Sequence, residues 1–261
     1  MRVLFIGDII GKSGRNVLKG NLKELKKEYE VDVCIANGEN TASGIGITCV
    51  IAQELYGYGV DIITTGNHVY SKKEVFNFIE SDKNIVRPAN YPEGAPGQGS
   101  MVFNTSKGKL GVINLLGRIY MNPCDCPFKA ADREIEEIKK QTRMIFVDFH
   151  AEATSEKAAL AWYLDGRVSC VIGTHTHVQT ADERILDYGT AFISDAGMTG
   201  PSDGIIGVDR DISIRRFITC IPEHFEVAKG IAQLNGVIID IEENTGKSIK
   251  IQRLDIRNID V

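Results

Sequence analysis

The sequence predicts an α/β fold, and three observations carry that prediction. Short apolar runs rich in β-branched residues alternate with helical stretches along most of the chain. Most of these runs end in polar residues, as strands of α/β sheets do where they build sites at their carboxyl ends. The 261 residues, 43% of them hydrophobic and 25% charged, are enough for a substantial core. We therefore expect one domain that covers residues 1–261.

The first part of the chain alternates between expected strands and expected helices. Strands are expected at VLFIGD (residues 3–8), VDVCIAN (31–37) and VDIITTGN (60–67), which are dense in Val and Ile. Helices are expected from Gly11 to Glu30, from Thr48 to Tyr58 and from Ser71 to Glu80. This order is typical of a sheet whose strands are joined by covering helices.

The remainder of the chain adds hairpins to the same alternation. A first hairpin is expected from SMVFNT (100–105) and KLGVINLLG (109–117), after a Gly- and Pro-rich loop at 90–99. A charged helix from Ala130 to Gln141, the strand RMIFVDFH (143–150), the helix SEKAALAWYL (155–164) and the run VSCVIGTHTH (168–177) follow. ERILDYGT (183–190) with AFISDAG (191–197), and the two halves of the tail at 236–256, predict two more hairpins.

Composition excludes several classes of protein. No run of about 18 apolar residues could span a bilayer, and Asp8 interrupts the apolar stretch that a secretory signal would need. The six scattered cysteines favour free thiols over a disulfide framework. The net charge of -5 argues against a broad electrostatic grip on nucleic acid but leaves a small anionic substrate open. We expect a cytoplasmic protein without a membrane partner.

Residues that can bind metal follow five of the apolar runs. They are Asp8; Glu39 and Asn40; Asn67 and His68; His150; and His175 with His177. Because the carboxyl ends of parallel strands share one edge of a sheet, these side chains could converge although they are far apart in sequence. Four of the five histidines fall here, and only His224 lies elsewhere.

GTHTH, residues 173–177, is the most specific of these motifs. In an extended segment residues i and i+2 face the same side, so His175 and His177 are expected to point together at a metal. Imidazoles combined with Asp8 and Glu39 suit Mn, Fe or Zn better than a lone Ca or Mg. Taken singly, an Asp after a strand is usually a turn residue, and His150 could be a satisfied core histidine. Their joint recurrence favours a centre of two metals bridged by a carboxylate.

The ordered motifs resemble those of the calcineurin-like metallophosphoesterases. The resemblance rests on Gly7-Asp8, on GNH at 66–68, on the isolated His150 and on GTHTH. Three departures stand out: Ile10 replaces the histidine of the usual D-x-H, Glu39-Asn40 replaces a GD, and Val69 follows GNH in place of an acidic residue. With GDIIGKSGR and ANGENTASGIGIT, these departures make the chain similar to the bacterial YmdB-like branch, nearly end to end.

This resemblance implies a four-layer α/β/β/α sandwich of mixed sheets, with helices on both outer faces. It also implies two divalent transition-metal ions, Fe or Mn with Zn as a further candidate, and hydrolysis of cyclic nucleotides, both 2′,3′-cyclic and 3′,5′-cyclic. Residue by residue, it places Asp8, Glu39, Asn40 and His177 around one metal, and Asn67, His150 and His175 around the other, with Glu39 as the bridge. A hydroxide generated at the metals would attack phosphorus, and His68, which the ligand count leaves over, would protonate the leaving alkoxide as general acid.

Two other functions stay open at this stage. The same metal centre could serve a phosphomonoesterase, either a nucleotidase or a protein phosphatase. A regulatory RNA-binding protein with little turnover is the alternative from another class. A homo-oligomer is compatible with either, and the sequence does not identify the residues that contact substrate.

Other motifs carry less weight. The glycines of GDIIGKSGR lack the spacing of a phosphate-binding loop, so a strand-to-helix turn is expected. Cys124 and Cys126 have no second pair to complete a zinc site, so they are expected to be loop thiols. The segment Asp195 to Gly207 is expected to be a loop, either an ordinary flexible one or one that faces substrate or another subunit. Three arginines near it, Arg210, Arg215 and Arg216, could contact phosphate, although an exposed helix face is the commoner explanation.

Overall fold

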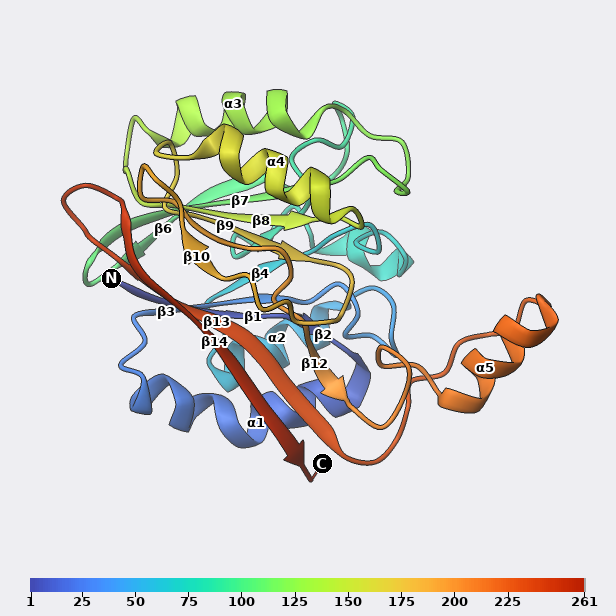
Figure 1. The fold of residues 1–261 in the computed structure, drawn as a ribbon. Coiled ribbons are helices and arrows are strands. Elements are labelled where there is room, and N and C mark those ends of the chain that lie inside the picture. Colours follow the sequence, from blue (N-terminus) through green and yellow to red (C-terminus); the bar gives the residue numbers. More distant parts are fainter. Residues whose placement is uncertain (261) are drawn as a thin grey trace.

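The structure, a computed structural model, describes residues 1–260 as two stacked sheets with helices on both outer faces (Figure 1). One sheet has eight strands in the order β2-β12-β13-β1-β3-β4-β5, with β14 also paired to β13. The other has six strands in the order β10-β11-β9-β8-β7-β6. The four-layer α/β/β/α sandwich expected from the sequence is therefore confirmed.

The eight-stranded sheet combines the start of the chain with its end. Its strands are β1 (Arg2–Ile6), β2 (Asp8–Ile9), β3 (Val33–Asn37), β4 (Ile62–Thr64), β5 (Ile85–Val86), β12 (Met198–Pro201), β13 (Ala232–Ile241) and β14 (Ser248–Ile259). β1, β3, β4 and β5 run parallel to their neighbours, whereas β13 pairs antiparallel with β1 and with β14. The outer face is covered by α1 (Gly11–Glu28) and α2 (Cys49–Tyr58).

The six-stranded sheet contains the middle of the chain. Its strands are β6 (Ser100–Thr105), β7 (Gly108–Leu116), β8 (Ile145–His150), β9 (Cys170–Thr174), β10 (Arg184–Ile185) and β11 (Ala191–Ile193). β7, β8, β9 and β11 are parallel, and β6 and β10 close the sheet as antiparallel hairpin strands. α3 (Pro127–Ile138) and α4 (Thr154–Leu164) cover its outer face. The three expected hairpins are confirmed.

Apolar side chains fill the spaces between the layers. Leu18 and Leu22 of α1 pack under the first sheet, and Leu160 and Leu164 of α4 pack on the second. Between the sheets, the rings of Phe5 and Phe146 lie 5.2 Å apart. Burial of such side chains is the main favourable term in folding, and here it fixes how the two sheets face each other.

Three expected elements differ in the structure. Ser71 to Glu80 is not a helix: only Lys73–Asn77 is helical (η1), with tighter 3₁₀ bonds such as the one from the Phe78 N–H to the Val75 carbonyl, because so short a segment gains little from α-helix propagation. α3 begins three residues early, because Pro127 suits a first turn whose N–H groups lack partners anyway. Within Asp195 to Gly207, the stretch Met198–Pro201 is buried strand β12 and not loop.

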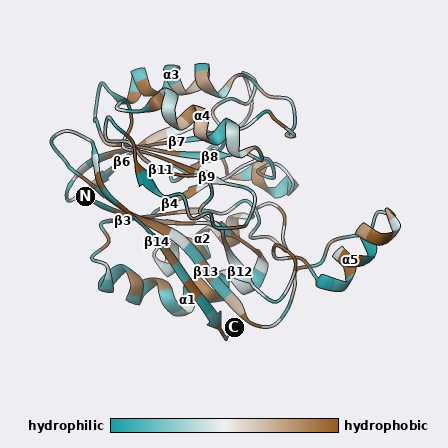
Figure 2. Ribbon diagram, in the orientation of Figure 1, coloured by the Kyte–Doolittle hydropathy of each residue, from teal (hydrophilic) through white to brown (hydrophobic). Residues whose placement is uncertain are grey.

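One helix projects from the four layers. α5 (Arg210–Thr219) is drawn in orange in Figure 1, and Figure 2 shows hydrophobic residues on it although it lies away from the sandwich. Phe217 is 81% exposed and Ile218 is 77% exposed. None of the helices in residues 1–260 combines the length and the apolar run that crossing a membrane requires. The six cysteines in the described chain are all free thiols, as expected.

Candidate metal centre

The ligand-type residues lie at the edge where the carboxyl ends of both sheets meet. β1, β3 and β4 lead to Asp8, to Glu39 with Asn40, and to Asn67 with His68. β8 ends at His150, and β9 leads to His175 and His177. The expected convergence occurs, but the edges of two sheets build it and not the edge of one.

Four ligand atoms form a tight group, which we call the closed half. His150 Nε2 lies 2.9 Å from Glu39 Oε1, 3.1 Å from Asn67 Oδ1 and 3.0 Å from His175 Nδ1. Glu39 and His150 are 1% and 0% exposed. One ring N–H cannot donate to three acceptors at once, whereas a cation among these atoms would satisfy them all. The donor set therefore fits a divalent transition metal.

Residues behind His150 orient its ring. The other ring nitrogen, Nδ1, lies 3.0 Å from the Thr174 hydroxyl, which donates to Asp148 Oδ1 at 2.7 Å. Such outer hydrogen bonds fix which nitrogen of a histidine faces a metal. Sequence reasoning missed Asp148 and Thr174. The signal was present, because Asp148 is a charged residue inside the otherwise apolar run IFVDFH.

The other ligand-type residues, Asp8, Asn40 and His177, are more widely spaced, and we call them the open half. Asp8 Oδ1 is buried without a hydrogen-bond partner among the described residues, and it lies 3.9 Å from His177 Nε2. The Asn40 amide nitrogen is 3.3 Å from the same His177 nitrogen. His177 Nδ1 lies 2.9 Å from the Ile206 carbonyl, which can only accept, so Nδ1 carries the proton and Nε2 presents its lone pair. An unpartnered buried carboxylate oxygen facing that lone pair also fits a cation.

The pKa values of the site reflect its buried and closely spaced charges. Burial opposes ionisation of Glu39, but the nearby His150 ring lowers the pKa of this carboxyl to about 2. Burial likewise disfavours a charged His150, yet Glu39, Asp8 and Asp148 raise its pKa to about 9. Burial, together with repulsion from His150, lowers the pKa of His175 to about 3 and keeps it in the neutral form that binds metals. Burial also raises the pKa of Asp8, so in the metal-free site the proton on His150 balances the charge of Glu39, and a bound metal would replace that proton.

GTHTH reaches the site by a different backbone geometry from the one expected. β9 ends at Thr174, and His175 and His177 adopt left-handed φ angles of 101° and 64°, so the alternation argument for an extended segment was wrong. Asp195 holds the turn: its Oδ2 accepts from the Thr176 N–H at 3.0 Å and from the Lys157 ammonium at 2.7 Å. Strained backbone of this kind persists where surrounding contacts over-determine it, often at functional sites.

Gly66 of GNH has a steric role. A Cβ at this position would lie 2.4 Å from His150 Cδ2 and 2.5 Å from Glu39 Oε2. Only glycine lets the chain after β4 approach the closed half this closely.

His68 lies beside the ligand group and not inside it. Its backbone N–H donates to Glu39 Oε2 at 2.8 Å, and its ring Nε2 is 3.3 Å from the Asn67 amide nitrogen. Asn67 therefore presents its oxygen to His150 and its nitrogen to His68. The His68 ring also lines the cleft that opens over the site.

The cleft has a volume of about 640 Å³, within the range of small-molecule sites. Part of its lining is formed by Glu39, Asn40, His68, His175 and His177. Another part of the lining, the arm wall, comes from a segment that we call the arm, residues 206–227, which includes α5. His224 belongs to this wall, although its position in the sequence gave no sign of it. Arg210, Arg215 and Arg216 do not line the cleft; they lie on α5, where Arg215 pairs with Glu223 at 2.9 Å.

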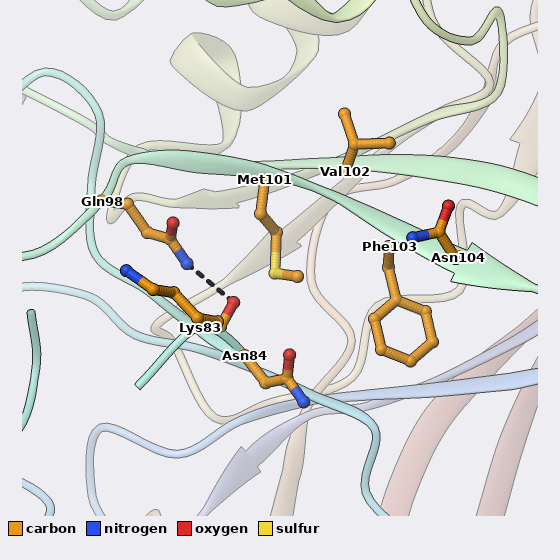
Figure 3. A pocket seen from close by; sticks show the side chains of 7 residues that line it. All are labelled: Lys83, Asn84, Gln98, Met101, Val102, Phe103 and Asn104. Carbon is orange, nitrogen blue, oxygen red and sulfur yellow. Dashed lines mark hydrogen bonds between the residues drawn. The ribbon is translucent and has the colours of Figure 1, made fainter. Parts of the chain in front are cut away.

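A second hollow, at β6, has none of this chemistry. Figure 3 shows its lining: Lys83, Asn84, Gln98, Met101, Val102, Phe103 and Asn104. The Gln98 amide donates to the Lys83 carbonyl at 2.8 Å. The lining contains no carboxylate or imidazole, so this hollow is not a candidate metal centre.

Ile10, which replaces a histidine of the usual motif, packs against the arm. It is 3% exposed, and a Cβ at Gly207 would lie 3.1 Å from its Cγ2. Ile10 therefore gives the arm an apolar packing surface where the usual motif has a histidine. Asn40 is the polar residue next to His177.

Comparison with known proteins agrees with the geometry. The model of the YmdB-like protein family matches residues 4–254. The 2′,3′-cyclic-nucleotide 2′-phosphodiesterase of Bacillus subtilis is 54% identical over 258 residues, which cover 99% of this chain and 98% of that protein. The crystal structure of a novel phosphatase from Mycoplasma pneumoniae superposes with a TM-score of 0.94 at 42% identity, covering all of this chain and 94% of that one. That of a hypothetical protein from Thermus thermophilus gives 0.93 at 41% identity, covering 99% and 100%. The resemblance seen in the motifs is confirmed, and the chain belongs to the YmdB-like family.

Proposed function

We propose that this chain is a metal-dependent phosphoric diester hydrolase that acts on cyclic nucleotides, with 2′,3′-cyclic nucleotides as the first substrates and 3′,5′-cyclic nucleotides as the second. The observation that carries the proposal is the ligand group at the floor of the cleft, with His68 beside it. The 54% identity to the Bacillus subtilis phosphodiesterase supports the reaction type.

Two divalent ions, Fe or Mn with Zn as a further candidate, would hold phosphate oxygens and make water a stronger nucleophile near neutral pH. Asn67, His150 and His175 would hold one ion in the closed half. Asp8, Asn40 and His177 would hold the other in the open half. Glu39 offers one oxygen to His150 and the other to the His68 N–H, and it lies next to Asn40, so it is suited to connect the halves.

His68 would complete the reaction as general acid. Water oxygen bonds to phosphorus, the bond from phosphorus to the ribose 2′ oxygen breaks, and His68 gives its proton to that oxygen. The proton that the attacking water loses returns to His68, so the step balances, and the product is a nucleoside 3′-phosphate. Asn67 positions the His68 ring, because its amide oxygen faces His150 and its amide nitrogen faces His68 Nε2.

A substrate comparison tests the proposal. With Mn²⁺ present, kcat/KM for a 2′,3′-cyclic nucleotide should exceed that for p-nitrophenyl phosphate, because a cyclic diester carries an alkoxide leaving group that His68 can protonate. A consistent preference for the monoester would identify a nucleotidase or protein phosphatase instead. No turnover of any phosphoester, with two ions verified, would favour the RNA-related binding protein.

We infer further that the chain works in the cytoplasm, where its six free cysteines would stay reduced. Cell fractionation with antibody detection would test this, and recovery outside the cytoplasmic fraction would contradict it.

We also infer that a second copy of the chain covers α5. Ile214, Phe217 and Ile218 form an exposed apolar stripe at helical spacing, and exposed Ile221 follows the end of the helix. Asp211 in the first turn and Arg216 in the last would face each other in an antiparallel pair of α5 helices. Light scattering should find a dimer that Ile218→Asp converts to monomers, and a wild-type monomer would contradict the inference.

A further inference from the structure

The arm wall of the cleft carries several apolar side chains beside the ligand group. Ile206, Val208, Phe225 and Val227 line it. Ile206 is 50% exposed and Phe225 is 47% exposed. Exposed apolar surface inside a concave site favours a ligand that removes it from water.

The base of the arm is fixed in place. Val208 pairs with Val227 in an antiparallel bridge, and the Asp209 N–H donates to the Glu226 carbonyl at 2.9 Å. Val227 sits against two glycines: a Cβ at Gly44 would lie 3.0 Å from it, and one at Gly11 would lie 3.1 Å from it. The wall is therefore preformed and does not depend on a ligand to assemble it.

The apolar wall adjoins the metal centre directly. The Ile206 carbonyl is bonded to the ring of His177 at 2.9 Å, so the Ile206 residue is one hydrogen bond from a candidate ligand. When the phosphate of a bound molecule lies at the ligand group, the rest of that molecule lies along the arm wall.

Phe225 is held in a way that suits stacking. The Arg216 guanidinium lies 4.3 Å from the ring centroid, and this cation–π contact fixes the ring. The ring also lines the cleft, and neighbouring His224 and Glu226 are exposed polar groups that can bond the edge of a base. Glu226 forms no ion pair within residues 1–260, so the wall disfavours a further anionic group.

We infer that the arm wall is a nucleoside-binding subsite, in which the neutral base stacks on Phe225 and Ile206 packs against the nucleoside while the phosphate lies at the ligand group. This inference rests on the proposed function for the position of the phosphate. If the subsite exists, the arm determines the preference of the site for nucleotides over other phosphodiesters.

The test uses Phe225→Ala with Trp162→Ala as a matched control. Trp162 is also half exposed, at 49%, and has an arginine over its ring, but it lies on α4 and does not line the cleft. Two substrates are compared with Mn²⁺ present: adenosine 2′,3′-cyclic phosphate, and the 2,3-cyclic phosphate of methyl riboside, which has the same reacting group and no base.

Phe225→Ala should lower kcat/KM for the cyclic nucleotide by about 5- to 150-fold, the range that base–aromatic stacking supplies. It should leave the base-free substrate unchanged, and Trp162→Ala should change neither. Equal losses on both substrates, or no loss on either, would overturn the subsite.

A binding measurement separates this inference from the proposed function. Millimolar adenosine, which has no phosphate, should shift the NMR signals of the Ile206 methyl groups in wild type and in Trp162→Ala, but not in Phe225→Ala. This result would support the subsite even if neither cyclic phosphate were cleaved. The absence of any adenosine-dependent shift in wild type would overturn it even if both were cleaved.

Discussion

The two halves of the candidate metal centre are built differently. In the closed half, three acceptor atoms lie 2.9 to 3.1 Å from His150 Nε2. In the open half, Asp8 Oδ1 is 3.9 Å from His177 Nε2, and Ile10 stands where related motifs carry a histidine. Glu39, Asn67 and His150 of the closed half follow or end strands β3, β4 and β8, and Thr174 lies behind His150. In the open half, His177 is positioned by a turn and by the Ile206 carbonyl of the arm. We therefore expect two ions of unequal affinity, with the tighter one in the closed half.

The largest effect should come from Glu39, because we propose that it connects the two halves. Glu39→Gln should lose both ions and all measurable turnover, whereas Asp8→Asn should weaken the open half alone. Elemental analysis after dialysis, with Glu24→Gln on the exposed face of α1 as a control, measures this. If the Glu39→Gln protein keeps two ions, Glu39 does not bridge them.

His68 should give the next largest effect without changing either half. His68→Ala should keep both ions and lose roughly 10² to 10⁴ in kcat on a cyclic nucleotide, the usual span for general acid catalysis. The loss should shrink on bis(p-nitrophenyl) phosphate, since p-nitrophenolate leaves without a proton. His175→Ala, in contrast, should lose metal.

Metal content and kcat for both histidine variants, on both substrates, decide between these roles. Equal losses on the two leaving groups, or loss of metal from His68→Ala, would make His68 a structural or ligating residue.

Thr174 offers a smaller change confined to the closed half. Thr174→Val removes the hydroxyl that links His150 to Asp148, and it should weaken binding of the tighter ion by about 10- to 100-fold, as changes behind a ligand usually do. Thr190→Val is the matched control, because Thr190 is also buried and hydrogen-bonded but lies away from the site. Competition with a metal chelator measures the affinity, and equal effects of the two variants would remove the proposed role of Thr174.

Ile10 should give the smallest effect. If it is a packing residue under the arm, Ile10→Val should lower the free energy of unfolding by about 0.5 to 1.5 kcal/mol and leave the number of bound ions unchanged. Urea denaturation with metal analysis measures both quantities. A change in metal content would mean that packing at Ile10 also shapes the open half.

The same contrast explains what could be predicted from sequence. Alternation of apolar runs predicts the strands and the helices α1, α2 and α4, because burial on one or both faces leaves a periodic pattern. The ligand-type residues could also be predicted, because they come after those apolar runs. The backbone of His175 and His177 could not be predicted, because left-handed turns held by Asp195 depend on contacts distant in sequence.

The arm was also beyond a sequence-based prediction. His224 and Phe225 lie in a segment without periodicity, and they line the cleft next to Val227, which packs against Gly11 and Gly44. Strand β12 was taken for loop because residues 195–207 are rich in glycine, although Met198–Pro201 are buried between β2 and β13. Tertiary packing decided both cases.

Calorimetric titration of Mn²⁺ into chelator-treated protein tests the central claim most directly. Two ions per chain should bind, in two steps of different affinity, with the tighter step lost in His150→Ala and the weaker step lost in His177→Ala. Binding of less than one ion per chain, unchanged when Fe²⁺ replaces Mn²⁺, would contradict the two-metal account.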